Sequence, residues 1–155
     1  MGVNKWACRR QGNFGVKGAI KGTKEEVLAW MKGHFAGLRP CDTEHRVIPA
    51  WIASYKGETM MFETSEGEEV YLVEDIGAAH KEEALKALAE MNAFLDSHSM
   101  AETVKDEEKH YLPLLEKIRA LGWVVLSDKL YRKDGDLHFR QKLVDPDSKE
   151  TWDIP

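Results

Sequence analysis

The sequence predicts an α+β fold in which helices pack on antiparallel sheet. Short stretches with alternating apolar and polar side chains are separated by glycine-containing turn pairs, as in antiparallel hairpins. Stretches with helical spacing fall between groups of strands, in the order two strands, one helix, three strands, two or three helices, two strands. The length of 155 residues is typical of one domain. We therefore expect a single domain over 1–155, built from hairpins and a three-stranded meander with three to four helices.

The first expected element is a hairpin formed by residues 5–10 and 16–21. Side chains alternate on both sides of a turn-like Gln11-Gly12-Asn13. If Arg10 pairs with Val16, one face of this hairpin is apolar and the opposite face is basic. The basic face would hold Lys5, Arg9, Lys17 and Lys21.

A helix should follow this hairpin. Thr23 and Glu26 have the spacing of a capping box, and Gly37 and Pro40 are stop signals. Residues 46–76 then contain three β-like runs, separated by glycine turn pairs, which predict an antiparallel meander.

The next predicted helix extends from Gly77 to about Ser97. Its expected buried stripe consists of Ala84, Leu85, Leu88, Met91 and Leu95. An acidic stretch over 102–108 leads to Pro113, which begins or breaks a further helix that ends at Gly122.

The chain should close with a hairpin, because Asp134-Gly135 favours a two-residue turn between strands at 123–133 and 136–144. This turn predicts an apolar face with Leu126 opposite Leu143 and Leu130 opposite Phe139. The other face would be basic and aromatic, with the pairs Ser127–Lys142, Lys129–Arg140 and Tyr131–His138. The Lys129–Arg140 pair places like charges side by side, which costs a few tenths to about 1 kcal/mol.

Charge is sorted along the sequence. Residues 1–40 contain eight bases and two acids, whereas residues 41–110 contain 17 acids and six bases. The last 45 residues contain eight of each, and the whole chain has a net charge of −5. Such sorting affects which partners a protein attracts and how fast they arrive. The overall negative charge disfavours nonspecific binding to duplex nucleic acid.

Common catalytic signatures are missing: the sequence has no Walker lysine loop, no dinucleotide-binding glycine pattern, no Gly-x-Ser-x-Gly and no His-Glu-x-x-His. We therefore predict no catalytic residues, no metal ligands and no cofactor, and consider an enzyme less favoured than a binding protein. Cys8 and Cys41 lack a Cys-x-x-Cys partner, which fits reduced thiols in the cytoplasm. No apolar run is long enough to span a membrane, and we expect no membrane partner.

These features predict a small cytoplasmic, noncatalytic binding protein of the inhibitor or adaptor type. Its partner would be another protein, of unknown identity, most readily one that handles nucleic acid and is drawn to acidic surfaces. The expected acidic residues are Glu66, Glu68, Glu69, Glu74, Asp75, Glu102, Asp106 and Glu107. The expected binding residues of the basic hairpin faces, two of them aromatic, are Lys5, Arg9, Lys17, Lys21, Lys129, Tyr131, His138, Arg140 and Lys142.

Two alternatives use the basic face of the C-terminal hairpin. One is an enzyme that binds a nucleotide or another small phosphate ligand, and the other is a protein that binds single-stranded nucleic acid by stacking and charge. Nucleic acid is kept as an alternative partner but is not favoured.

Overall fold

The computed structural model describes residues 5–11, 16 and 18–147 of the chain. Its contacts divide the chain into two compact units, one made of the described residues up to 76 and the other of residues 77–147. Helices and antiparallel strands occur in both units, so the predicted α+β class is confirmed. The single domain over 1–155 stays a prediction, and the two units are described in turn.

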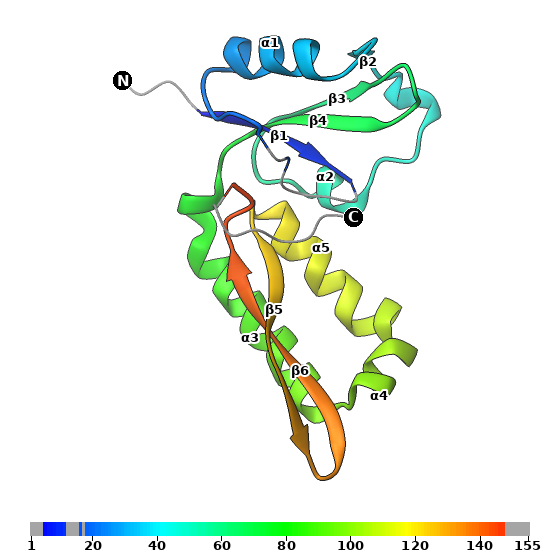
Figure 1. The fold of residues 1–155 in the computed structure, drawn as a ribbon, viewed down its shortest axis with the longest axis vertical. Helices are drawn as coiled ribbons and strands as arrows, with labels where there is room; N and C mark the ends of the chain where they lie inside the picture. Colours follow the sequence, from blue (N-terminus) through cyan, green and yellow to red (C-terminus); the bar gives the residue numbers. More distant parts are fainter. Residues whose placement is uncertain (1–4, 12–15, 17, 148–155) are drawn as a thin grey trace. The chain divides into compact units, whose positions relative to one another are not determined.

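The first unit is built on a four-stranded antiparallel sheet. Its strands are β1 (Trp6–Arg10), β2 (Arg39–Pro40), β3 (Thr59–Glu63) and β4 (Glu69–Glu74), in the spatial order β1-β4-β3-β2. Helix α1 (Lys24–His34) and the short helix α2 (Ala50–Ala53) lie on opposite sides of this sheet (Figure 1). A 3-10 turn, Thr43–His45, precedes α2.

Strand β4 is covered on both faces. Val70 and Leu72 pack with Val27 and Met31 of α1 in one buried cluster. On the other face Tyr71 meets Trp51 of α2, with ring centroids 5.2 Å apart in an edge-to-face arrangement. Both aromatic side chains are fully buried, so β4 is the centre of this unit's core.

The predicted N-terminal hairpin is wrong. β1 pairs along its length with β4, and within the described residues its strand pairing with the segment that follows is limited to an isolated bridge between Trp6 and Gly22. Trp6, Ala7, Cys8 and Arg9 are all buried, although they alternate between the two faces of the strand. A strand buried on both faces must belong to a sheet that is covered on both sides. Pairing with β4 places β1 in such a sheet.

The first strand of the predicted meander is also wrong. Residues 50–53 form α2 after Pro49, and the two-residue β2 occupies the edge of the sheet instead. Trp51 and Ile52 are consecutive and both buried. Consecutive side chains are about 100° apart on a helix and can both reach a wide buried face, whereas on a strand they point to opposite faces and a half-covered strand would expose one of them.

The second unit contains helices and a hairpin. After a 3-10 turn at Gly77–His80 come α3 (Lys81–Ser97), α4 (Met100–Lys105), a π-helical turn at Glu107–Tyr111 and α5 (Leu112–Ala120). Strands β5 (Val124–Lys133) and β6 (Asp136–Val144) form the predicted C-terminal hairpin. The hairpin packs on α3 and α5 around a core of Ala87, Met91, Leu95 and Ile118.

Two details of α3 differ from the prediction. The α-helix begins at Lys81, after the 3-10 turn, and not at Gly77. Leu85 is 45% exposed, and Ala87 takes a place in the buried stripe. Since each residue turns a helix by about 100°, Leu85 points away from the seam that Ala84 shares with Ala87.

The hairpin turn has the backbone that its sequence predicts. Asp134 and Gly135 have φ angles of 53° and 86°, as a type I′ turn requires. A Cβ at Gly135 would meet no atom within 4 Å, so a side chain there is opposed only by the backbone conformation.

We expect Gly135→Ala to lower the free energy of unfolding by about 1 to 2 kcal/mol, because an L-residue is strained at positive φ. The matched change Gly33→Ala lies in α1, where the glycine also has open space. It should raise the free energy of unfolding by about 0.5 to 1 kcal/mol, since alanine favours helix. Urea unfolding of both variants measures these effects. A neutral Gly135→Ala would contradict the assigned turn.

Candidate functional site: a groove between α3 and the hairpin

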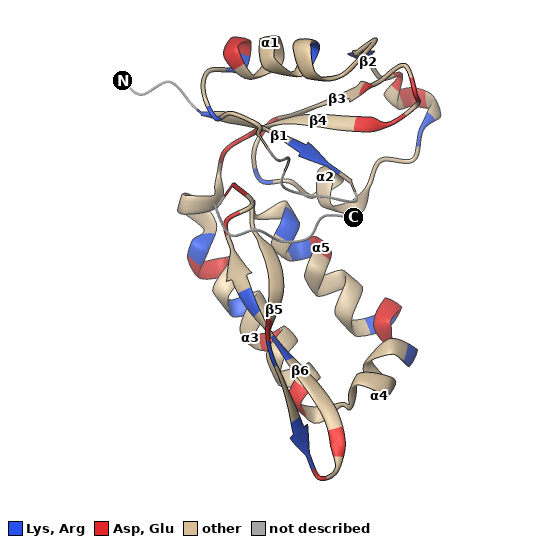
Figure 2. Cartoon of the chain, viewed as in Figure 1, with Lys and Arg blue, Asp and Glu red and all other residues tan. Residues whose placement is uncertain are grey.

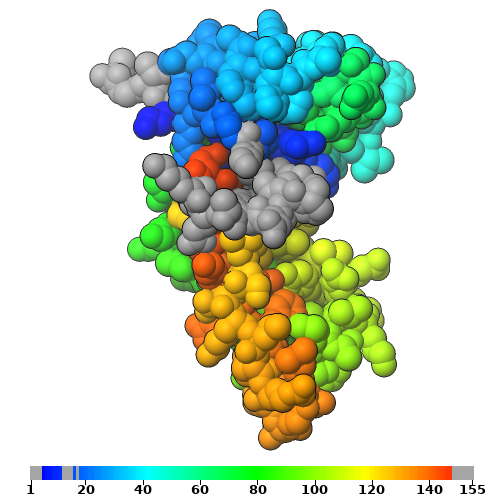
Figure 3. Space-filling model, in the orientation of Figure 1, coloured from blue at the N-terminus to red at the C-terminus, as the bar shows by residue number. Residues whose placement is uncertain are grey.

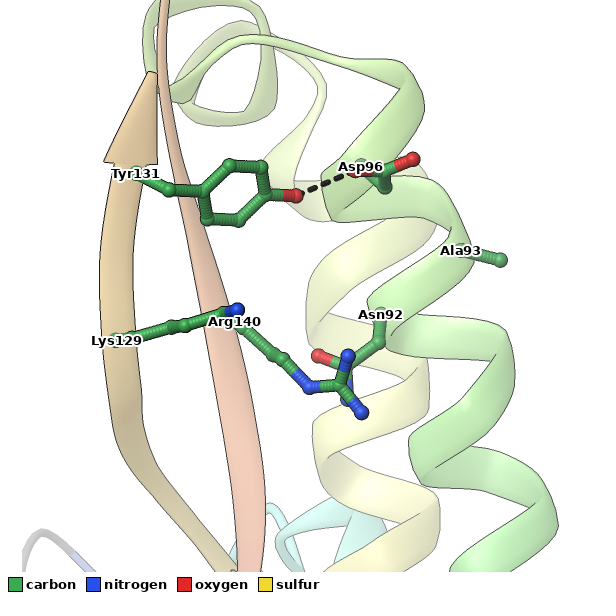
Figure 4. Close-up of a pocket in the computed structure, with 6 residues that line it drawn as sticks. All are labelled: Asn92, Ala93, Asp96, Lys129, Tyr131 and Arg140. Atoms are coloured by element: carbon green, nitrogen blue, oxygen red, sulfur yellow. Dashed lines mark hydrogen bonds between the residues drawn. The ribbon is translucent and has the colours of Figure 1, made fainter. Parts of the chain in front are cut away.

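A groove of about 390 Å³ lies between α3 and the C-terminal hairpin (Figure 4). Asn92, Ala93 and Asp96 line it from α3, Lys129 and Tyr131 from β5, and Arg140 from β6. The last turns of α3 therefore face the half of the hairpin that is closer to its turn.

The register of the hairpin brings the basic and aromatic side chains together. Counting from the turn, the pairs Tyr131–His138, Leu130–Phe139 and Lys129–Arg140 form as the sequence predicts. A β-bulge between Ser127 and Lys129 then shifts the register by one residue. Beyond it the predicted pairs are wrong, because the extra residue changes every partner that follows. Leu126 pairs with Lys142, Val125 with Leu143, and Ser127 with Gln141.

Hydrogen bonds attach the hairpin to the C-terminal part of α3. The Asn92 side chain binds both backbone groups of Gln141, donating to its oxygen at 3.0 Å and accepting from its nitrogen at 2.9 Å. Nearer the turn, Tyr131 donates its hydroxyl proton to Asp96 at 2.5 Å, and Lys133 binds the same carboxylate at 2.9 Å. Both ends of the groove are thus held by direct contacts.

These contacts shift three pKa values away from neutrality. The Tyr131 hydroxyl holds the pKa of the Asp96 carboxyl below its usual value, and the hydrogen bond from Lys133 lowers it further. The same bonds to Asp96 raise the pKa of Tyr131 and of Lys133. Asp96 therefore stays ionised, while Tyr131 and Lys133 keep their protons, over the whole physiological range.

Lys129 and Arg140 are neighbouring cations at the mouth of the groove. Both side chains are exposed and lie directly opposite each other in the ladder. Arg140 Nε lies 3.8 Å from a carboxylate oxygen of Asp128, the residue at the bulge. Lys129 forms no ion pair within the described part of the chain, and its Nζ lies 5.6 Å from the centroid of the Tyr131 ring. Of these two adjacent cations only Arg140 has an acidic partner among the described residues, at 3.8 Å, so an added anion would find favourable charge.

The other two expected residues of this hairpin face do not line the groove. His138 is buried, and its Nδ1 lies 2.9 Å from the Leu95 carbonyl oxygen. Its ring stacks on Tyr131 at 5.5 Å, so it supports that side chain and is not itself presented to solvent. Lys142 is half-buried opposite Leu126.

The expected N-terminal cations do not form one surface. Arg9 is 2% exposed, and its guanidinium donates to the Cys8 carbonyl oxygen at 2.9 Å. Lys21 pairs with Asp75 at 3.1 Å, while Lys5 is exposed. Lys17 lies outside the described residues. These residues belong to the first unit, whereas the hairpin belongs to the second.

Most of the expected acidic residues have local partners. In the first unit, Glu68 pairs with Arg10, Glu69 lies 3.7 Å from Arg46, and Glu74 accepts the backbone N–H of Glu58. Asp75 is the partner of Lys21, and Glu66 is exposed in a turn.

The acids of the second unit lie around α4. Glu102 completes the capping box of that helix with Ser99, Asp106 follows its end, and Glu107 begins the π-helical turn. The expected acids are therefore divided between two units, and several already have a basic partner or a structural role.

A possible set of cation ligands lies in the first unit. Asp42, Glu44 and His45 have ligand atoms within 4.8 Å of one another, and all three residues are exposed. Asp42 caps the 3-10 turn through the Glu44 N–H, and its other oxygen lies 2.6 Å from His45 Nδ1. Exposed clusters of this kind commonly form without an ion, so we do not take it as the functional site.

The sequence matches no protein-family model, and no curated protein or solved structure matches it. No helix within the described residues has the length and apolar character needed to cross a membrane. The site therefore depends on its own geometry for interpretation.

The contribution of α3 to the groove was missed at the sequence level. Asn92 follows Met91 in the apolar stripe, where a polar residue breaks the pattern, and Asp96 lies one turn further on. This polar interruption was the available signal, because a polar group on the inner side of a helix needs a partner.

Replacing Tyr131 with Phe should raise the pKa of Asp96 toward its ordinary value of 3.8, because the principal hydrogen bond to the carboxylate is lost. The folded-state pKa of Asp96 is depressed, so this contact stabilises the fold above the unfolded-state pKa and stops doing so as the pH falls through the folded-state value. NMR titration of the Asp96 carboxyl measures the change, with Arg132→Gln as a control. An unchanged pKa in Tyr131→Phe would contradict the contact.

Proposed function

We propose that the protein is a noncatalytic binding protein whose groove takes a carboxylate-bearing segment of another protein. The observation that carries this proposal is the pairing of Lys129 with Arg140 at an exposed groove, where Arg140 has Asp128 as an acidic neighbour and Lys129 forms no ion pair with a described residue. Like charges placed side by side cost stability, and an anion bound between them recovers it. In this proposal the protein acts as an inhibitor or an adaptor.

The residues around the groove support binding without catalysis. Its lining contains no cysteine, serine or histidine that could act as a nucleophile or base. General acid–base catalysis works best with a pKa near the operating pH, but the pKa values of Asp96 and Tyr131 are shifted away from neutrality. Both groups hold the hairpin on α3.

The local charge supports a protein ligand over a nucleic acid. Acidic residues accompany the basic ones along the hairpin (Figure 2), with Asp128 beside Arg140 and Asp96 beside Lys133. A polyanion that passes along this surface would meet these carboxylates. Base stacking on Tyr131 would also compete with His138 and Lys129, which already contact the ring.

The kind of partner differs from the expectation based on acidic surfaces. A basic, nucleic-acid-handling protein would need the expected acids to be free and gathered on one face, and several of them have local partners. The groove favours an acidic segment instead. A cytoplasmic location belongs to the same proposal, and it is supported by Cys8 and Cys41, which form no disulfide.

Charge reversal at Arg140 tests the proposal. Tagged wild-type protein and Arg140→Glu would be used to capture proteins from nuclease-treated native lysate at low and high salt, with quantification by mass spectrometry. We expect the variant to recover about tenfold less of any stoichiometric protein partner at low salt, since it replaces attraction by repulsion.

Lys86→Glu is the matched control, because Lys86 is exposed on α3 of the same unit, changes the net charge equally and does not line the groove. It should capture the partner like the wild type. Equal loss in both variants, or no loss in Arg140→Glu, would contradict the groove as the binding site. Recovery of nucleic acid alone from untreated lysate would favour the nucleic-acid alternative.

A further inference from the structure

The outer edge of β5 has no partner strand within the described residues. Among residues 77–147 the sheet consists of β5 and β6, and β6 is the strand with more extensive packing against α3. On β5 the side chains from Ser127 to Leu130 are exposed. Figure 3 shows the gold and orange residues of this hairpin at the surface of the second unit.

The turn determines which backbone groups point outward. In a two-residue hairpin the closing pair, here Lys133 and Asp136, exchanges both hydrogen bonds, and such pairs then alternate along the ladder. Tyr131 and Lys129 therefore direct their N–H and C=O groups toward β6. Leu130 and Arg132 direct theirs to the outer edge, where no hydrogen bond to another described segment is formed.

The two faces of this edge differ in chemistry. Lys129 and Tyr131 belong to the face that lines the groove. Leu130 belongs to the opposite face and is 60% exposed. Leu137 of β6, 36% exposed, shares that face with its pair partner Arg132. A strand placed beside β5 would alternate in the same way, with every second side chain on each face.

The charges along the outer edge of β5 determine which kind of strand can pair with it. Lys129, Arg132 and Lys133 make β5 basic near the turn, and they disfavour pairing with β5 of a second copy. An acidic segment is attracted by the same charges. The bulge at Asp128 interrupts the regular edge, so the available stretch is residues 129–133.

We propose that the outer edge of β5 binds an extended segment of the partner by strand addition, in which acidic and apolar residues alternate. The acidic side chains lie on the face of Lys129 and the groove, and the apolar ones pack on Leu130. Backbone hydrogen bonds to Leu130 and Arg132 supply affinity, and the alternation supplies specificity. This inference rests on the proposed function, since it gives the form in which the carboxylate reaches the groove.

Two capped peptides of identical composition provide the test. The probe Ac-Glu-Val-Glu-Val-Glu-Val-NH2 alternates, whereas Ac-Glu-Glu-Glu-Val-Val-Val-NH2 has the same charge without alternation. We expect the alternating peptide to bind the full chain about tenfold more tightly, because only it can place its acids and its apolar groups on separate faces. In NMR spectra its binding should slow amide exchange at Leu130 and Arg132, while Tyr131, already bonded within the hairpin, should change little.

Leu130→Pro removes an outward N–H without breaking the β5–β6 ladder and should abolish this preference, whereas Leu130→Ala keeps the N–H and should weaken binding only a few-fold. Melting temperatures establish that both variants fold, and the exchange measurement on the wild type needs neither variant.

Equal binding of the two peptides, with both dependent on Lys129 and Arg140, would overturn strand addition and leave the proposed function intact. Absence of peptide binding together with Arg140-dependent capture of a partner would have the same meaning. If neither peptide binds and the partner protein is captured equally by the wild type and by Arg140→Glu, both proposals are overturned.

Discussion

The attachment of the β5–β6 hairpin to α3 is the interaction on which the second unit depends. Two strands alone are marginally stable in water, so this hairpin needs a surface to hold it. Asn92 grips the backbone of Gln141, the Leu95 carbonyl meets His138, and Asp96 receives Tyr131. These three contacts follow one another along α3, two of them with β6 and one with β5, and they hold the hairpin against the helix. The groove exists because the same contacts hold its two walls together.

The charges of the groove follow from this arrangement. The negative charge of Asp96 is offset by Lys133, and its carboxylate also accepts the Tyr131 hydroxyl proton, so it adds little repulsion to an incoming anion. The turn at Asp134 and Gly135 determines the register of the hairpin, and this register places Lys129 opposite Arg140. Asp128 partly offsets the pair, which keeps the groove weakly rather than strongly basic. Under the proposed function, a weakly basic site would discriminate between an acidic peptide and a dense polyanion more readily than a strongly basic cleft would.

Local signals predicted what local interactions determine. The capping box of Thr23 and Glu26, the hairpin turn and the three predicted pairs between that turn and the bulge were readable from the sequence, because each depends on residues close along the chain. The bulge at Asp128 was not, since a single extra residue leaves no change in composition. The partner of β1 was not predictable either, because it lies about sixty residues away in β4 and competes with a nearby segment that alternates equally well. For the candidate site, the hairpin side chains were identified, whereas the α3 wall required the three-dimensional structure.

The position of β4 in the chain has a consequence for synthesis. Every strand of the first unit's sheet lies within residues 6–74, and α1 and α2 lie within the same range. These elements can therefore pair and bury Trp51 and Tyr71 while the ribosome is still making the second unit. In the second unit α3 is translated before the hairpin that it supports. When β5 and β6 are synthesised, the helix that supports them is therefore already present. This order shortens the time during which the open edge of β5 is exposed without α3.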